Sequence, residues 1–278
     1  MANIPISIMI LTLNEEDNIE ACLDSVSDFD EAVVFDSFSS DQTTQRAEAK
    51  GARVVQRKFD NWSAHQNWAM ENIDFKNPWV FYLDADERMT PELQAEVKAI
   101  AEGETEHRAY YCGRKNYFMG KWIRHAMPPG TIMRFFQPPH IRFERLVNPT
   151  PVVDGSIGYL THMFEHYNFS KGLAEWFAKH NNYSSMEAVE GMKVVNEVGR
   201  PWGKVFTRDR AERRQALKQI SFSLPMRANL KFLYFYFVQR GFLDGRAGYL
   251  YCKLQATYEL MIDMKMKELK RKEKGLAV

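Results

Sequence analysis

Two acidic side chains one residue apart, Asp84 and Asp86, carry the strongest chemical signal in this sequence of 278 residues. They follow the apolar stretch Trp79–Leu83, which is typical of a buried strand. Carboxylate oxygens are the ligands that hard divalent cations such as Mg²⁺ or Mn²⁺ prefer, and such a cation would bridge the protein to a diphosphate. Considered alone, the pair is equally well explained by an acidic turn before the next helix.

Polar side chains follow two earlier predicted strands in the same way. The strands are Ile6–Leu11 and Ala32–Phe35, and both are nearly continuous apolar runs, as expected of parallel strands covered on two faces. In open α/β sheets the ligand lies outside the carboxyl ends of the strands. We therefore expect one acid-lined site, to which the first strand contributes Asn14 and Glu15 and the second contributes Asp36.

Strands and helices alternate through the first hundred residues, which predicts a parallel α/β sheet. A further strand is expected at Arg53–Gln56. Four helices are expected: the first starts near Ile19, the second ends at Lys50, the third spans Trp62–Ile73 and the fourth starts after Thr90. The first glycine of the chain is Gly51. No glycine-rich dinucleotide fingerprint or phosphate loop can therefore follow the first strand, and NAD-binding, FAD-binding and P-loop proteins are excluded.

The distribution of charge excludes a uniformly basic nucleic-acid-binding protein. From Arg200 onward there are 18 basic and 7 acidic residues, whereas the preceding 199 residues carry 19 basic and 29 acidic ones. Three distant cysteines form no disulfide framework, as expected of a reducing cytosol. The N-terminal residues predict a strand and not a signal peptide, and no apolar stretch approaches the roughly 20 residues of a transmembrane helix.

Taken together, and in their order along the chain, the motifs resemble those of family 2 glycosyltransferases of the GT-A fold. The similar segments are Thr12-Leu13-Asn14-Glu15, Asp36-Ser37-Phe38-Ser39-Ser40-Asp41, Asp84-Ala85-Asp86, and residues 114–123 and 241–248. They are similar to the subgroup that contains the lipopolysaccharide-core β-1,4-glucosyltransferases. Two positions depart from the pattern: Phe38 stands where glycine is usual, and Phe143-Glu144 stands where the subgroup tends to carry His-Glu.

This resemblance implies a GT-A fold, which is a Rossmann-like, mostly parallel sheet flanked by helices. It also implies an inverting, metal-dependent transfer of a hexose from a nucleotide-diphosphate sugar, with UDP-glucose as the preferred donor and Mg²⁺ or Mn²⁺ as the cofactor. The acceptor would be a lipid-linked glycan or a lipopolysaccharide core. By the same resemblance, Thr12, Asn14 and Glu15 would line the nucleotide, Asp36 would bind the base or ribose, Asp84 the ribose or diphosphate, and Asp86 the metal.

Inverting transfer needs a general base that takes the proton of the acceptor hydroxyl. Glu144 is the first candidate, because it matches the glutamate of the subgroup and lies between Arg142 and Arg145, which would hold it ionised. Asp154 and Glu165 are the other candidates.

The region between Pro128-Pro129 and Pro138-Pro139 shows no clear period and predicts a loop that shapes the acceptor pocket, with Arg134 in it. His162 and His166 would share one face of a helix and suggest zinc if that segment were helical, but packing or acceptor contacts are the preferred interpretation.

Residues 1–200 are predicted to form the GT-A domain, with a nucleotide half at about 1–105 and an acceptor half at about 106–200. Residues 201–278 are predicted to form a basic, amphipathic helical extension. Its aromatic and basic residues are typical of helices on an anionic membrane surface, although a helical subdomain packed on the sheet is the alternative. We expect a cytoplasmic protein, peripheral on the inner face of the cell membrane, without a nucleic-acid partner.

Two other functions fit the same features. One is a glycosyltransferase acting on polyprenyl phosphate, although many of these append transmembrane helices. The other is a non-catalytic, membrane-associated binding module on a lapsed transferase fold. The intact pair of Asp84 and Asp86 favours an enzyme, because a lapsed site would have no reason to retain two metal-competent carboxylates.

Overall fold

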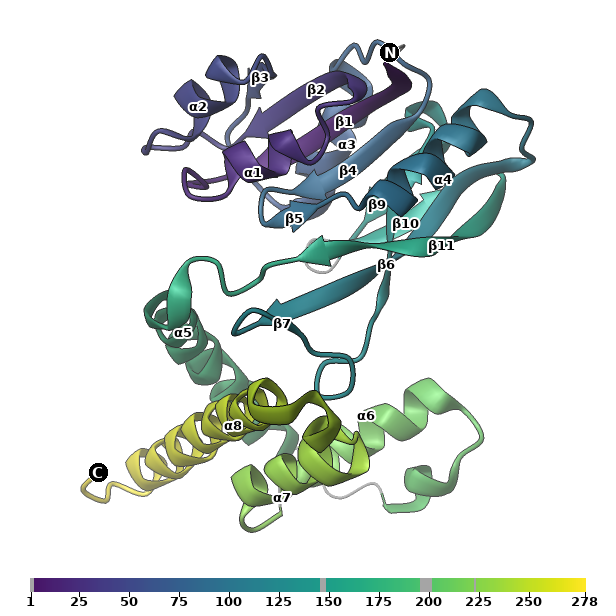
Figure 1. Ribbon diagram of the computed structural model, residues 1–278. Helices are drawn as coiled ribbons and strands as arrows, with labels where there is room; N and C mark the ends of the chain where they lie inside the picture. Colours follow the sequence, from purple (N-terminus) through teal and green to yellow (C-terminus); the bar gives the residue numbers. More distant parts are fainter. Residues whose placement is uncertain (1–2, 146–148, 196–201, 223) are drawn as a thin grey trace. The chain divides into compact units, whose positions relative to one another are not determined.

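The computed structural model describes residues 3–145, 149–195, 202–222 and 224–278 (Figure 1). The chain divides into two compact units. Unit 1 comprises the chain up to Tyr117 together with Pro129–Ser170, and unit 2 comprises Phe118–Pro128 together with Lys171–Val278. The domain boundary predicted at residue 200 lies outside the described residues. The predicted acceptor half contributes to both units.

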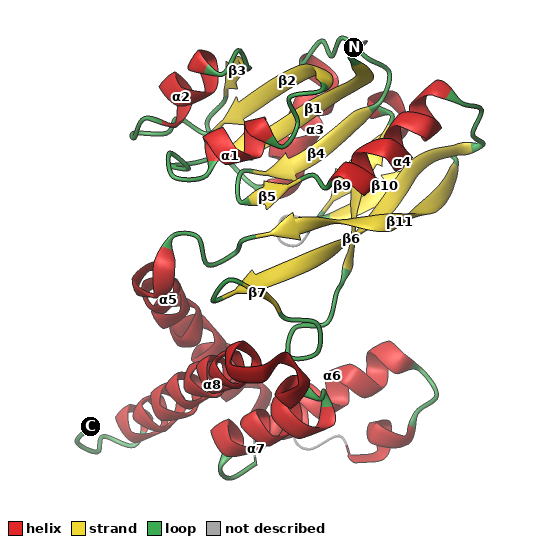
Figure 2. Ribbon diagram, in the orientation of Figure 1, coloured by secondary structure: helices red, strands yellow, loops and turns green. Residues whose placement is uncertain are grey.

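Unit 1 begins with alternating strands and helices (Figure 2). They are β1 (Ile4–Thr12), α1 (Ile19–Asp24), β2 (Phe29–Asp36), α2 (Thr43–Ala49), β3 (Arg53–Gln56), α3 (Trp62–Asn72), β4 (Val80–Asp84) and α4 (Pro91–Glu102). The four strands pair in parallel in the order β3-β2-β1-β4. The prediction of a parallel α/β sheet is therefore confirmed, and the predicted elements fall close to their observed bounds.

The second half of unit 1 extends the same sheet with strands of mixed direction. They are β5 (Glu87–Arg88), β6 (His107–Phe118), β8 (Thr131–Phe136) and β11 (Ser156–His166), with β9 (Ile141–Glu144), β10 (Thr150–Val153) and the 3₁₀ turn η1 (Pro138–His140) beside them. The order continues from β4 through β8, β6 and β11 to β5. Strands β6 and β11 are parallel, whereas β8 is antiparallel to β4 and β6. Strands β9 and β10 form a separate antiparallel pair.

One expectation for this region is wrong. The segment between the two proline pairs is not a loop but contains β8, whose Phe135 and Phe136 are fully buried between β4 and β6. The prolines lie outside the ends of this strand, where they interrupt no pairing. His162 and His166 lie on β11, so the helical spacing considered for zinc does not occur.

Two apolar cores cover the two faces of the main sheet. Alternate residues of β1 point to opposite faces. Ile6, Ile8 and Ile10 pack with residues of α1, α2 and α4, whereas Met9 and Leu11 pack with residues of α3 and β9. Because both faces of the parallel strands are covered, their polar side chains gather at the carboxyl ends.

Unit 2 is mainly helical. Its elements are β7 (Lys121–Trp122), α5 (Gly172–Lys193), the 3₁₀ turn η3 (Trp202–Phe206), α6 (Arg210–Ser221), α7 (Arg227–Leu233), the π-helical turn η4 (Tyr234–Val238), the 3₁₀ turn η5 (Gly241–Asp244) and α8 (Gly245–Glu273). Helix α8 packs against α5 and α7, and a buried ion pair between Arg227 and Glu259 joins α7 to α8. No helix among the described residues is long and apolar enough to cross a membrane.

The buried carboxylate of Asp244 holds the loop at residues 124–126 of unit 2 by hydrogen bonds. Its oxygens accept hydrogen bonds from the backbone N–H groups of Arg124, His125 and Ala126 at 3.1, 2.9 and 2.8 Å. The ring of His125 adds a contact at 2.8 Å. Burial opposes the ionisation of Asp244, but these hydrogen bonds outweigh it and lower its pKa. Nearby, a Cβ atom at Gly248 would lie 2.2 Å from the carbonyl oxygen of Gly241, which explains the glycine at position 248.

We expect Asp244→Ala to destabilise the protein by about 3 kcal/mol, because each buried N–H left without an acceptor costs about 1–3 kcal/mol and the loop can relax only in part. Urea unfolding followed by circular dichroism measures the loss. Asp263→Ala is the matched control, since that carboxylate accepts from Lys267 one turn further along α8. Equal unfolding midpoints for the two variants would contradict the role of Asp244.

Candidate functional site

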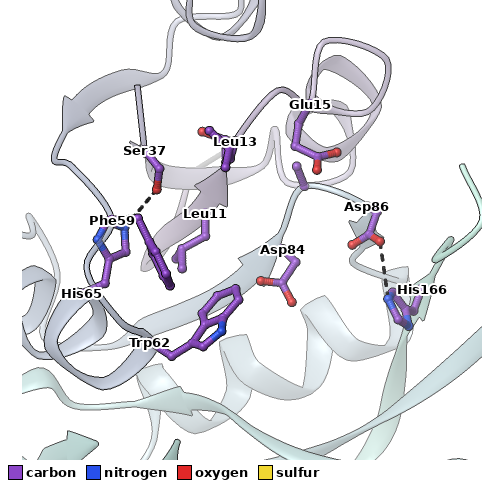
Figure 3. Close-up of a pocket in the computed structure, with 12 residues that line it drawn as sticks. Leu11, Leu13, Glu15, Ser37, Phe59, Trp62, His65, Asp84, Asp86 and His166 are labelled. Atoms are coloured by element: carbon purple, nitrogen blue, oxygen red, sulfur yellow. Dashed lines mark hydrogen bonds and ion pairs between the residues drawn. The ribbon is translucent and has the colours of Figure 1, made fainter. Parts of the chain in front are cut away.

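A cavity of about 320 Å³ opens at the carboxyl ends of β1, β2 and β4 (Figure 3). The strand register explains its position, because Thr12 pairs with Asp36 and Leu11 pairs with Asp84, so the three strands end at the same level. The residues that line the cavity are Leu11, Thr12, Leu13, Glu15, Ser37, Phe59, Trp62, His65, Asp84, Ala85, Asp86 and His166.

One end of the cavity carries a carboxylate and an imidazole that face each other. Oδ2 of Asp86 lies 3.5 Å from Nε2 of His166 (Figure 3). Nδ1 of His166 lies 2.8 Å from Oδ1 of the buried Asn116. Because an amide oxygen accepts, Nδ1 carries a proton. Nε2 faces Asp86, donates to its carboxylate when the ring is doubly protonated, and offers a lone pair when the ring is neutral. The sequence motifs did not identify His166 as a partner of Asp86.

This end fits a divalent cation. Burial opposes the ionisation of Asp86, but the hydrogen bond from His166 and the charges of His166 and Arg134 lower its pKa. A carboxylate and an imidazole oriented by a buried amide are a common ligand arrangement for such ions. Among the described residues, no group of three or more His, Cys, Asp or Glu side chains is arranged so that it could hold a metal ion by itself. A cation held by Asp86 and His166 would therefore complete its coordination with oxygens of a ligand or water.

The carboxylate of Asp84 is held by two neighbouring side chains. Nη2 of Arg134 lies 2.6 Å from Oδ2 of Asp84, and the hydroxyl of Tyr82 donates to Oδ1 at 3.1 Å. The same Nη2 lies 2.7 Å from Glu87, which in turn accepts from the backbone N–H of Asp84 at 2.9 Å. Burial raises the pKa of Glu87 to about 7, although Arg134 opposes the shift. Arg134 was expected in an acceptor loop, but it lies on β8 beside the acidic pair.

The other end of the cavity is aromatic. His65 stacks on Phe35, with ring centroids 4.2 Å apart. Its Nδ1 accepts from Arg57 at 3.0 Å, so Nε2 carries the proton that points to Ser37 at 3.4 Å. Burial, helped by the charge of Arg57, lowers the pKa of His65 to about 4, which keeps the ring neutral near pH 7. The sequence motifs did not identify His65.

Two exposed aromatic rings stand beside His65. Phe59 and Trp62 meet edge to face, with ring centroids 5.1 Å apart, and remain 38% and 44% exposed. Such rings at a cavity wall offer stacking surfaces for a planar base. Helix α3 places Trp62 and His65, and Asn61 caps that helix by accepting from the backbone N–H of Ala64 at 3.0 Å.

Asp36 and Asn14 are not among the residues that line the cavity. The carboxylate of Asp36 is fully buried and accepts from the Thr12 hydroxyl, the Ser39 backbone N–H and the Gln56 amide at 2.8, 2.9 and 3.0 Å. Burial opposes its ionisation, but the hydrogen bonds from Ser39 and Gln56 prevail and lower its pKa. Oδ1 of Asn14 accepts from the backbone N–H of Ser40 at 2.8 Å. Both side chains therefore shape the loop after β2.

The structure does not bring the candidate bases to the cavity wall. Glu144 is exposed on β9, 3.1 Å from Arg142, and points away from the buried face of Phe143. Asp154 is exposed in the turn after β10. Glu165 accepts hydrogen bonds from the hydroxyls of Tyr117 and Tyr167 at 2.9 and 2.6 Å. The identity of the base stays a prediction.

The sequence was also compared with known proteins. The family model "Glycosyl transferase family 2" matches residues 7–164. An uncharacterized glycosyltransferase of Rickettsia bellii is 38% identical over 104 residues, which is 37% of this chain and 35% of that protein. An uncharacterized glycosyltransferase of Rickettsia typhi is 26% identical over 98% of this chain and 89% of its own length. The lipopolysaccharide core biosynthesis glycosyltransferase LpsC of Rhizobium meliloti is 26% identical over 42% of this chain and 44% of its own.

The family match covers more than half of the chain, and it coincides with the strands that form the cavity. The parallel sheet flanked by helices, with carboxylates at the strand ends, is the GT-A arrangement that the motifs implied. The chain belongs to glycosyltransferase family 2 and is a glycosyltransferase.

Proposed function

We propose that the protein transfers a hexose from a UDP-sugar, such as UDP-glucose, to a lipid-linked glycan or a lipopolysaccharide core, with inversion and with the help of a divalent cation. The cavity at the strand ends carries this proposal, because it joins an aromatic end to the pair Asp86 and His166. The likeness to LpsC, which is named for lipopolysaccharide core biosynthesis, supports the class of acceptor.

The donor would lie along the cavity from its aromatic end to Asp86. The uracil ring of the donor would stack beside Phe59 and Trp62, near Thr12 and Glu15. Asp36 and Asn14 would act indirectly, Asp36 by fixing the hydroxyl of Thr12 and Asn14 by holding the loop after β2. Asp84, oriented by Arg134 and Tyr82, would accept a hydrogen bond from the ribose or sugar.

Asp86 and His166 would hold Mg²⁺ or Mn²⁺, and Asn116 would keep the imidazole in the required orientation. Such a cation neutralises the charge that develops on a departing diphosphate. Without it, Asp84, Asp86 and Glu15 would repel the phosphates. The proton of the acceptor hydroxyl would pass to Glu144, with Asp154 and Glu165 as the alternatives.

We also propose that unit 2 binds an anionic membrane surface, where a lipid-linked acceptor is found. Large apolar side chains are exposed from α7 to η5: Leu230, Leu233, Tyr234, Phe237, Val238, Phe242 and Leu243. Between Leu224 and Tyr258 the sole acidic residue is Asp244, which is buried, whereas Lys231, Arg240, Arg246 and Lys253 are basic. An apolar surface with a basic rim supplies the two signals that stable peripheral binding requires.

The cation is tested by Asp86→Asn. We expect this variant to lose at least about tenfold of its Mn²⁺-dependent affinity for UDP, because a neutral amide is a poor ligand for a hard cation. Isothermal titration with Mn²⁺ and with EDTA measures the difference. Asp24→Asn, at an exposed ion pair with Lys50, is the control. A UDP affinity that is the same in wild type and Asp86→Asn would refute the assignment.

The role of Glu144 as the general base is tested by the substitution Glu144→Gln. We expect unchanged UDP binding and a loss of roughly 10²–10⁴-fold in transfer, because the amide cannot accept a proton. Transfer of labelled sugar from UDP-glucose to a lipopolysaccharide extract measures turnover, and Arg142→Gln controls for the loss of the ion pair with Glu144. If Glu144→Gln turns over at the wild-type rate, the base is another residue, and Asp154→Asn and Glu165→Gln are measured next.

Membrane binding is tested by sedimentation with vesicles that contain phosphatidylglycerol. We expect binding that is weakened but not abolished in about 0.5 M NaCl, where the Debye length is roughly 4 Å and the apolar contribution remains. Replacing both Phe237 and Phe242 by Ser should remove the salt-resistant part. Phe206→Ser, at a ring that is 88% exposed in η3, is the matched control. Folded wild-type protein that stays in the supernatant at low salt would refute the proposal.

A further inference from the structure

Strand β11 contains a bulge at residues 160–162, shortly before the residue that faces Asp86. On one side of the bulge, Tyr159 pairs with Tyr111 of β6. On the other side, Met163 pairs with Gly113. Over this stretch β11 advances four residues while β6 advances two, so β11 accommodates two extra residues. Such a bulge shifts the register of every later pair along the strand.

The bulge determines which side chain of β11 reaches the end of the cavity. After it, His166 pairs with Asn116, the buried amide that orients its imidazole. If the register before the bulge simply continued, Phe164 would pair with Asn116, and His166 would lie two residues further along β6. A shift of two residues keeps every side chain on its original face of the sheet, because the faces alternate with a period of two. The alternation of apolar residues therefore does not oppose this shift, and a specific interaction must hold the bulge.

Helix α4, which packs on β11, supplies such an interaction through Glu96. One oxygen of this carboxylate accepts from the backbone N–H of Thr161 at 2.8 Å, and the other accepts from that of His162 at 2.9 Å. Both residues belong to the bulge. Nδ1 of His162 also lies 3.0 Å from the carboxylate, to which it can only donate. A single side chain thus binds two consecutive backbone N–H groups and one ring.

The environment of Glu96 strengthens these contacts. Burial opposes its ionisation, but the hydrogen bonds from the backbone N–H groups of Thr161 and His162 lower its pKa. The carboxylate is therefore ionised near pH 7, and hydrogen bonds to a charged acceptor are roughly twice as strong as neutral ones. Thr90, at the start of the same helix, donates its hydroxyl to the carbonyl of Met163 at 3.3 Å. Helix α4 therefore holds both the bulge and the first residue that pairs after it.

We propose that Glu96 is a positioning residue for the cation site, because it locks the bulge of β11 and so keeps His166 opposite Asn116 and beside Asp86. Glu96 is not among the residues that line the cavity, and it acts through the register of the strand. The inference rests on the proposed function, in which Asp86 and His166 hold the cation.

The substitution Glu96→Gln tests this role, because an amide has a single oxygen and its own N–H groups would face a backbone N–H. Titration calorimetry of the full-length protein with UDP is carried out in Mn²⁺ and in EDTA. We expect the affinity in Mn²⁺ to fall by about tenfold or more, as for other residues that orient a metal ligand, and the affinity in EDTA to stay unchanged. Glu102→Gln, at an exposed ion pair with Lys98 on the same helix, is the control and should change neither affinity.

Removing the two extra residues provides a complementary test. Deletion of Thr161 and His162 leaves a strand that can pair regularly with β6 and still brings His166 to Asn116. In this shortened chain we expect the Mn²⁺-dependent affinity for UDP to be retained and to be insensitive to Glu96→Gln. A loss that the deletion restores cannot come from general damage to the fold.

The outcomes separate this inference from the proposed function. If UDP binds equally in Mn²⁺ and in EDTA to the wild-type protein, the proposed cation site fails and this inference fails with it. If Asp86→Asn and His166→Ala lose the Mn²⁺-dependent affinity but Glu96→Gln keeps it, the positioning role is overturned. A combined variant that melts like the wild type but binds as weakly as Glu96→Gln would overturn the role of the bulge. If the deletion prevents folding, the comparison of Glu96→Gln with Glu102→Gln decides alone.

Discussion

The buried guanidinium of Arg134 holds together the acidic turn on which the site depends. It lies 2.6 Å from Asp84 and 2.7 Å from Glu87, where two carboxylates would otherwise repel each other in a medium of low polarity. Removing one partner of such a buried ion pair costs about 3–5 kcal/mol, because the remaining charge is left without compensation. The guanidinium therefore sets the conformation of the chain from Asp84 to Arg88.

The position of His166 follows from that conformation. Glu87 pairs with His166 between β5 and β11, and the backbone N–H of Tyr167 donates to the carbonyl of Asp86 at 2.8 Å. The turn therefore brings the last strand of the sheet to the acidic pair. One ion pair within the sheet thus determines where a carboxylate and an imidazole meet, although neither of those groups bonds to Arg134.

The elements of the first hundred residues could be predicted because each is encoded locally, by an apolar run, by an apolar stripe at helical spacing or, in α3 and α4, by a capping side chain. Arg134 and His166 could not be placed, because both reach the site through pairing between strands that are distant in sequence. Arg134 is 50 residues from Asp84, and the prolines around its strand favoured a loop. The residue types of Asp36 and Asn14 are equally compatible with binding a ligand and with holding a loop. Only the neighbouring hydrogen-bond donors, which the sequence does not reveal, show that these side chains hold the loop. Phe38 adopts the left-handed conformation of the usual glycine, with φ of 62°, and its ring is exposed.

The hydrogen bonds of Asp244 have a consequence for the order of events during synthesis. Its partners lie 118 to 120 residues earlier in the chain, so at about 5–20 residues per second they leave the ribosome roughly 6–24 seconds before it. During that interval the backbone N–H groups of Arg124, His125 and Ala126 lack the acceptor that they have in the folded protein. Unit 1, whose last residue is Ser170, can therefore fold while the polypeptide is still growing, whereas this loop of unit 2 forms its final hydrogen bonds only after Asp244 has been synthesised.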